Sequence, residues 1–161
     1  MPRAALVLID LVNAFDYSGG EALRDATLQV VPAIATLAQR ARAAEVPVIY
    51  ANDNFGKWRS DFRKLVDTLS APDHPAQAVV RPLVPHPDDY FILKPRHSAF
   101  YGTPLELFLH DLEVERVVLT GIATDSCVLM TACDAHVRQF RVQVPRDCVA
   151  TQVASAVTLA I

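Results

Sequence analysis

Short apolar runs alternate with helical segments along the 161-residue chain, and this alternation constrains the fold more than any other feature. The run at residues 4–9 contains only apolar residues, as expected for a strand that is buried on both faces of a parallel sheet. Strands separated by helices form parallel sheets with right-handed crossovers, so the chain is predicted to be α/β with helices on both faces. The expected strands are residues 4–9, 46–51, 90–93, 115–119 and 140–144.

The segments between these runs carry apolar residues at helical spacing. Leu28, Val31 and Ile34 recur at intervals of three in the first segment, where Pro32 is expected to mark a kink or a new start. No internal repeat, low-complexity segment or linker interrupts the pattern, so residues 1–161 are predicted to form one domain. The expected helices are residues 21–44, 61–69, 103–111, 127–138 and 150–161, with one or two helical turns around residues 77–81.

Composition argues against several classes of protein. Fifteen Lys and Arg against 18 Asp and Glu give a net charge of −3, with the signs mixed along the chain, so no nucleic-acid partner is expected. The apolar runs are too short to span a bilayer, so no membrane partner is expected either. Three cysteines at unrelated spacings argue against a disulfide framework and favour a reducing, cytoplasmic location.

Polar side chains follow the ends of the expected strands. Asp10 follows the first strand, Asn52 and Asp53 follow the second, and Lys94 follows the third. The fourth strand is followed by the segment at residues 121–127. Because ligands bind beyond the carboxyl ends of strands in such sheets, we expect an acid, a cation and a thiol to converge there.

The segment LTGIATDSCVLMTACDAHV, at residues 119–137, is the candidate location of a nucleophile. Thr124, Asp125 and Ser126 are expected to cap a helix that begins near Cys127. A thiol in the first turn of a helix lies at the positive end of the backbone dipole, which favours the thiolate. Free backbone N–H groups there can also bind an oxyanion.

Each of these residues has a simpler structural interpretation when it is considered alone. Asp10 can cap the turn after the first strand, Lys94 can be exposed at a strand end, and Cys127 can be a small buried hydrophobe. Cys133 lies well past the first turn of the expected helix, and Cys148 carries no partner signature. These last two cysteines are therefore interpreted as structural.

Three segments of the chain resemble the signature motifs of one enzyme superfamily. ALVLIDLVNAF, FILKPRHSAFYGTPLE and GIATDSCVLMTACDA look like those of the isochorismatase-like cysteine hydrolases, which include nicotinamidases and N-carbamoyl amidohydrolases. The resemblance covers essentially the whole chain, with the motifs in the right order and spacing. It implies a three-layer α/β/α sandwich with a mostly parallel, Rossmann-like sheet of five or six strands. It also implies a homo-oligomer, a dimer or larger.

By motif position, the resemblance implies a catalytic triad of Asp10, Lys94 and Cys127. It further implies a cis peptide bond between Ile122 and Ala123 that turns the backbone N–H groups of Ala123 and Cys127 toward an oxyanion. Asp10 would take the thiol proton and return it to the leaving amine, while Lys94 keeps the carboxylate ionised. The expected activity is hydrolysis of a C–N bond in a small amide or carbamoyl substrate through a thioester, without a cofactor.

Two other functions stay open at this point. A vinyl-ether hydrolase of the isochorismatase type does not require the thiol. A non-catalytic module would use a reactive thiol for redox sensing or protein interaction. Intact Asp10 and Lys94 favour an enzyme, because a binding module has no need of them.

The loop after the second strand departs from the nicotinamidase pattern. Nicotinamidases use an Asp-x-His pair and a further histidine to bind a metal, whereas this chain has Phe55 two residues after Asp53. Phenylalanine has no lone pair to donate, so no metal site is expected. Asp53 would then cap the loop or accept a hydrogen bond from a backbone N–H near Gly56. The predicted substrate-pocket residues are Phe15, Asn54, Phe55, Trp58 and His97.

Overall fold

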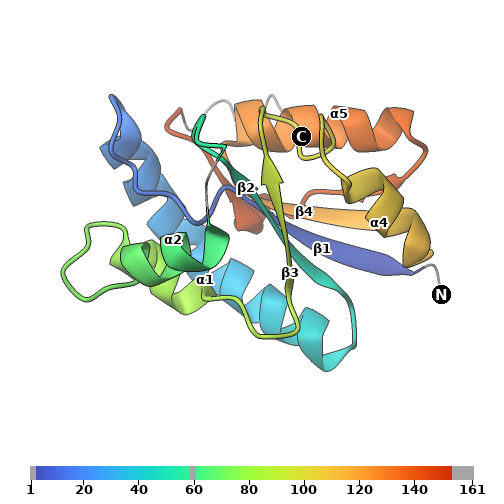
Figure 1. The fold of residues 1–161 in the computed structure, drawn as a ribbon, viewed down its shortest axis with the longest axis horizontal. Coiled ribbons are helices and arrows are strands. Elements are labelled where there is room, and N and C mark those ends of the chain that lie inside the picture. Colours follow the sequence, from blue (N-terminus) through green and yellow to red (C-terminus); the bar gives the residue numbers. More distant parts are fainter. Residues whose placement is uncertain (1–2, 59–60, 154–161) are drawn as a thin grey trace.

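A parallel sheet of six strands forms the centre of the protein (Figure 1). The structure is a computed structural model that describes residues 3–58 and 61–153. The strand order is β3-β2-β1-β4-β5, and β6 pairs with the carboxyl end of β4. Every described pair of neighbouring strands is parallel. The strands are β1 (Ala4–Ile9), β2 (Val48–Asp53), β3 (Tyr90–Lys94), β4 (Arg116–Ile122), β5 (Arg141–Gln143) and β6 (Val149–Ala150).

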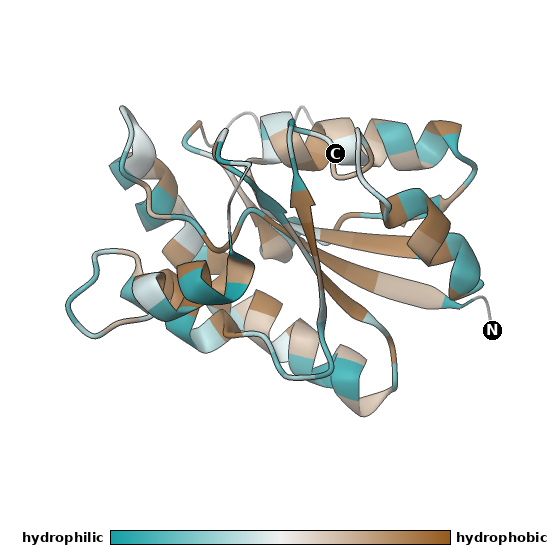
Figure 2. Cartoon of the chain, viewed as in Figure 1, coloured by the Kyte–Doolittle hydropathy of each residue, from teal (hydrophilic) through white to brown (hydrophobic). Residues whose placement is uncertain are grey.

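Helices cover both faces of this sheet, whose strands are largely hydrophobic (Figures 1 and 2). The apolar side chains of the sheet are buried against these helices. Leu6 and Leu8 of β1 pack under the first helical layer, whereas Val7 and Ile9 pack under the second, as the two-residue repeat of a strand requires. The predicted three-layer α/β/α sandwich is confirmed. The first layer holds α1 (Gly20–Ala43), α2 (Phe62–Leu69), α3 (Gln77–Val80) and a 3₁₀ turn at Arg81–Leu83; the second holds α4 (Leu105–Asp111) and α5 (Leu129–Val137).

Strand β4 extends further than its sequence predicts. The expected end at Leu119 is wrong, because Thr120, Gly121 and Ile122 continue the strand. Gly121 has φ 110°, and a Cβ at this position would collide with the backbone carbonyl of Ile9. Glycine therefore allows β1 and β4 to approach closely at the end where the polar residues gather.

The segment that carries the cysteine also differs from its prediction. A single π-helical turn at Thr124–Val128 precedes α5, and the residue before that turn, Ala123, provides no side-chain cap. The predicted caps from Thr124 to Ser126 are therefore wrong. Asp125 instead accepts a hydrogen bond from Thr151 Oγ1 at 2.7 Å, which ties the turn to the segment after β6.

Several other helix and strand boundaries differ from those that the sequence predicts. The second strand begins two residues later than expected, and α1 continues through Pro32. A 3₁₀ turn at Arg146–Cys148 leads into β6, which includes Ala150, so the predicted helix start at that residue is wrong. The rest of that predicted helix, from residue 154 onward, lies outside the described residues. Within residues 3–58 and 61–153, no helix combines the length and apolar character needed to cross a bilayer.

Candidate active site

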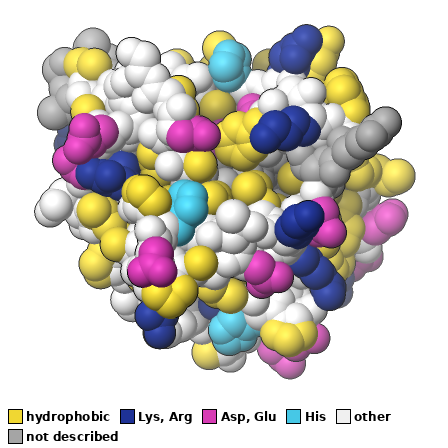
Figure 3. Space-filling view, turned by 60° about the vertical axis from the view of Figure 1, so that its left-hand side comes forward, with side chains coloured by type: hydrophobic (Ala, Val, Ile, Leu, Met, Phe, Trp, Pro, Cys, Tyr) yellow, Lys and Arg dark blue, Asp and Glu magenta, His cyan; other side chains and the backbone are white. Residues whose placement is uncertain are grey.

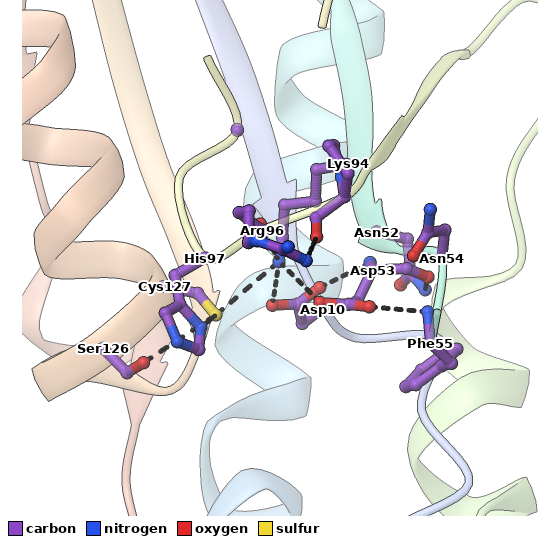
Figure 4. Close-up of polar contacts among 12 residues, drawn as sticks. Asp10, Asn52, Asp53, Asn54, Phe55, Lys94, Arg96, His97, Ser126 and Cys127 are labelled. Carbon is purple, nitrogen blue, oxygen red and sulfur yellow. Dashed lines mark hydrogen bonds and ion pairs between the residues drawn. The ribbon is translucent and has the colours of Figure 1, made fainter. Parts of the chain in front are cut away.

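The carboxyl ends of β1, β3 and β4 bring an acid, a cation and a thiol together (Figure 4). Lys94 Nζ lies 2.8 Å from Asp10 Oδ2 and 3.6 Å from Cys127 Sγ. The strand order changes direction between β1 and β4, and Asp10 follows the first of these strands while Cys127 lies just beyond the second. The three side chains thus meet in the crevice where α/β sheets bind their ligands.

Lys94 is fully buried, but its ammonium group is surrounded by acceptors. Besides Asp10 and the thiol, it contacts the backbone carbonyl oxygen of Arg96 at 3.2 Å and Asp53 Oδ2 at 3.5 Å. Burial acts to lower the pKa of Lys94, but the nearby negative groups outweigh burial and raise the pKa. The side chain therefore carries a fixed positive charge in the middle of the site.

Asp10 is held by backbone contacts at the end of β1. Its φ of 53° is left-handed, a conformation that aspartate adopts more readily than most residues, and its Oδ1 accepts a hydrogen bond from Asp53 N at 2.8 Å. The Asn52 side chain bonds both the N–H and the C=O of Val12, which fixes the following loop against β2. Burial raises the pKa of Asp10, although Lys94 acts to lower it. The carboxylate can therefore accept a proton more readily than an exposed aspartate.

Cys127 lies in the π-helical turn with its thiol half-buried. Its carbonyl oxygen accepts a hydrogen bond from Thr131 Oγ1 at 2.7 Å, and its Sγ lies 3.7 Å from His97 Nδ1. Burial, and next the charge of Asp10, raise the pKa of the thiol to about 12. These two effects oppose the thiolate, against the charge of Lys94, and Cys127 precedes α5 in the π-helical turn instead of lying in the first turn of that helix. The expected preference for the thiolate stays a prediction.

The peptide bond between Ile122 and Ala123 is cis. It joins the end of β4 to the π-helical turn, in which the carbonyl oxygen of Ala123 accepts hydrogen bonds from Ser126 N and Val128 N, both at 3.1 Å. The proposed role of the backbone N–H groups of Ala123 and Cys127 toward an oxyanion stays a prediction.

The predicted pocket residues occupy different surroundings. His97 contacts the thiol, whereas Phe15 is buried in the core beneath the first helical layer. Asn54 is buried and accepts a hydrogen bond from Gly56 N at 2.9 Å. Phe55 and Trp58, in the same loop, are 41% and 83% exposed. Their contact with a substrate stays a prediction.

Two contributions to the site were missed by sequence reasoning. Asp53 caps the loop as expected, through a hydrogen bond from Phe55 N to its Oδ1 at 2.6 Å, but it also contacts Lys94. Tyr17 lies in the loop after β1. Burial, and to a smaller extent the charges of Asp10 and Cys127, raise the pKa of Tyr17. Its position in the loop that follows Asp10 was the available signal.

On the face shown in Figure 3, acidic and basic side chains are interspersed among hydrophobic ones. In the part of the chain that the structure describes, no group of three or more His, Cys, Asp or Glu side chains is arranged to hold a metal ion.

Comparisons with known proteins identify the family of the chain. A family model described as the isochorismatase domain matches residues 4–161. The chain is 38% identical to the uncharacterized isochorismatase family protein YaaI of Bacillus subtilis, over 91% of this chain and 80% of that protein. It is 31% identical to an N-carbamoylsarcosine amidase of an Arthrobacter species, over 96% of this chain and 62% of that enzyme, which is therefore considerably longer.

A solved structure gives the same relationship in three dimensions. The crystal structure of N-carbamoylsarcosine amidase from Thermoplasma acidophilum matches with a TM-score of 0.75 and 27% sequence identity. The match covers 97% of this chain and 88% of that one. The fold is thus shared with an amidase over nearly the whole chain.

Proposed function

The chain belongs to the isochorismatase family of hydrolases, and on this basis we propose that it cleaves the C–N bond of a small amide or carbamoyl compound through a thioester on Cys127. The observation that carries the proposal is the position of the Lys94 ammonium, within 3.6 Å of both the Asp10 carboxylate and the Cys127 thiol. The similarity to two N-carbamoylsarcosine amidases supports the substrate class.

The first half of the reaction forms the thioester. The Asp10 carboxylate takes the proton of the Cys127 thiol, and the sulfur attacks the substrate carbonyl carbon. Lys94 stabilises the sulfur while it is negative, and the backbone N–H groups of Ala123 and Cys127 stabilise the oxyanion. The C–N bond then breaks as the protonated Asp10 gives its proton to the departing nitrogen, so that ammonia or an amine leaves.

The second half restores the enzyme. Asp10 takes a proton from a water molecule, whose oxygen attacks the thioester carbon. The C–S bond breaks and the thiolate leaves, then regains a proton from Asp10. The raised pKa of Asp10 suits this cycle, because it makes the carboxylate a better proton acceptor, whereas the raised pKa of Cys127 keeps the thiol protonated until Asp10 takes its proton.

The proposal is tested by screening small amides and N-carbamoyl compounds for ammonia release, with Cys127→Ala assayed in parallel. We expect at least one compound to be hydrolysed by the wild-type protein and left intact by the variant. The same turnover in both proteins would overturn the thiol mechanism and favour vinyl-ether chemistry. No turnover of any compound, with Cys127 still open to redox modification, would favour the non-catalytic module.

A further inference from the structure

A second carboxylate, that of Asp53, shares the ammonium group of Lys94 with Asp10 (Figure 4). Asp53 is the last residue of β2, and its Oδ2 lies 3.5 Å from Lys94 Nζ, compared with 2.8 Å for Asp10 Oδ2. The Asp53 side chain is 31% exposed, whereas the lysine is fully buried. The cluster therefore holds two carboxylates around one cation, and one of the two is open to solvent.

We propose that Asp53 is a positioning residue that limits how strongly Lys94 stabilises negative charge on Cys127, and thereby keeps the thiol protonated until Asp10 accepts its proton. The inference rests on the proposed function only for the identity of the nucleophile. It assigns Asp53 an electrostatic task in addition to capping its loop.

The charges around Lys94 set the direction in which Asp53 changes the stability of the thiolate, and their distances set the size of this effect. The attraction between Lys94 and the sulfur depends on the net charge at the ammonium, and a carboxylate 3.5 Å away offsets part of that charge. Without Asp53, the cation would act on Asp10 and Cys127 alone. The thiolate would then form more easily, and Asp10 would bind a proton less tightly. With Asp53 present, the thiol therefore keeps its proton until Asp10 accepts it, and Cys127 is not a permanent thiolate.

The loop-capping role of Asp53 can be separated from its charge. Asp53 Oδ1 accepts the hydrogen bond from Phe55 N at 2.6 Å, and Phe55 adopts a left-handed φ of 52°. Asparagine keeps a side-chain oxygen at that position and can accept the same hydrogen bond, but it carries no charge. Alanine removes both the charge and the acceptor. The other titratable groups in contact with the ammonium or the thiol are Asp10, which pairs with Lys94, and His97, which lies beside Cys127.

The test measures the rate at which iodoacetamide alkylates Cys127, followed by peptide mapping between about pH 7 and 9. We expect Asp53→Asn to raise this rate about three- to tenfold at each pH, because Lys94, no longer offset by the carboxylate of Asp53, would stabilise the thiolate more strongly. Asp53→Glu, which keeps the charge, should stay close to the wild type. Asp67→Asn, which removes an exposed carboxylate from α2, is the matched control and should have no effect.

An unchanged rate in Asp53→Asn would overturn the proposal. A change confined to Asp53→Ala would also overturn it, because the residue would then act through the loop alone. This readout does not depend on hydrolysis. If the amide screen fails while Asp53→Asn still speeds alkylation, the hydrolase proposal fails and the electrostatic role of Asp53 stands.

Discussion

Replacing Lys94 with methionine should destabilise the folded protein strongly. Methionine keeps most of the apolar length of the side chain but removes its charge. Lys94 is fully buried and lies 2.8 Å from Asp10, which is itself buried, so the variant leaves a buried carboxylate without its cation. Removing one partner of a buried ion pair costs about 3–5 kcal/mol. We expect a loss of this size in the free energy of unfolding near pH 8.

The double variant Asp10→Asn with Lys94→Met separates the unpaired charge from the lost packing. It removes both charges at once, and replacing a buried ion pair by neutral groups is often close to neutral for stability. Asparagine can also keep the hydrogen bond from Asp53 N. The double variant should therefore recover most of the loss and lie within about 2 kcal/mol of the wild type.

Urea unfolding at about pH 8 and pH 5 provides the assay. Burial already raises the pKa of Asp10, and removing Lys94 raises it further, because the charge of Lys94 acts to lower it. An acid whose pKa is higher in the folded state binds protons more tightly there, so its folded form gains stability as the pH falls. The deficit of Lys94→Met should thus be smaller at pH 5. The reasoning would be refuted if Lys94→Met were as stable as the wild type at pH 8. It would also be refuted if the single and double variants lost the same free energy of unfolding.

Three further predictions concern activity, thiol reactivity and metal. Turnover should fall about a thousandfold in each of the variants Cys127→Ala, Asp10→Asn and Lys94→Met, and these losses should not add in double variants, because the three residues act as a unit. Fully additive losses in steady-state assays would contradict this. Brief iodoacetamide labelling at neutral pH should modify the exposed Cys133 before Cys127 and Cys148, whose pKa values burial raises to about 12. Faster labelling of Cys127 would show that the thiolate exists in the free protein. Activity should survive dialysis against EDTA, because no metal site is expected. The opposite result would be one equivalent of bound metal, with activity lost on chelation and restored by that metal, and it would favour nicotinamide-like substrates.

Local sequence patterns account for most of the fold. An apolar run such as residues 4–9 is long enough to identify a buried strand, and β1 has these bounds. The two-residue strand β6 has no such pattern of its own and forms because Val149 and Ala150 pair with the end of β4. Thr120 and Gly121 likewise suggest a strand end, but pairing with β1 carries β4 past them. These elements depend on contacts between distant residues, which local patterns do not contain.

The candidate site also combines features that the sequence predicts with features that depend on contacts between distant residues. Motif positions identified Asp10, Lys94 and Cys127, whose contacts the structure then supplies. The contact between Lys94 and Asp53 and the burial of the thiol arise from packing, and this burial opposes the thiolate that a place near a helix start favours. The homo-oligomer and the single domain stay predictions.

Trapping the thioester tests the central claim most directly. A substrate found in the amide screen is turned over in the presence of hydroxylamine, and the products are separated and quantified. If Cys127 carries the acyl or carbamoyl group, hydroxylamine will intercept it after ammonia or an amine has left, and part of the product will be the hydroxamate or hydroxyurea. If thioester formation limits the rate, ammonia should be released equally fast with and without hydroxylamine. Cys127→Ala should form neither the hydrolysis product nor the hydroxylamine product. Hydrolysis that continues in Cys127→Ala, with no product intercepted in the wild type, would contradict a covalent intermediate on this cysteine.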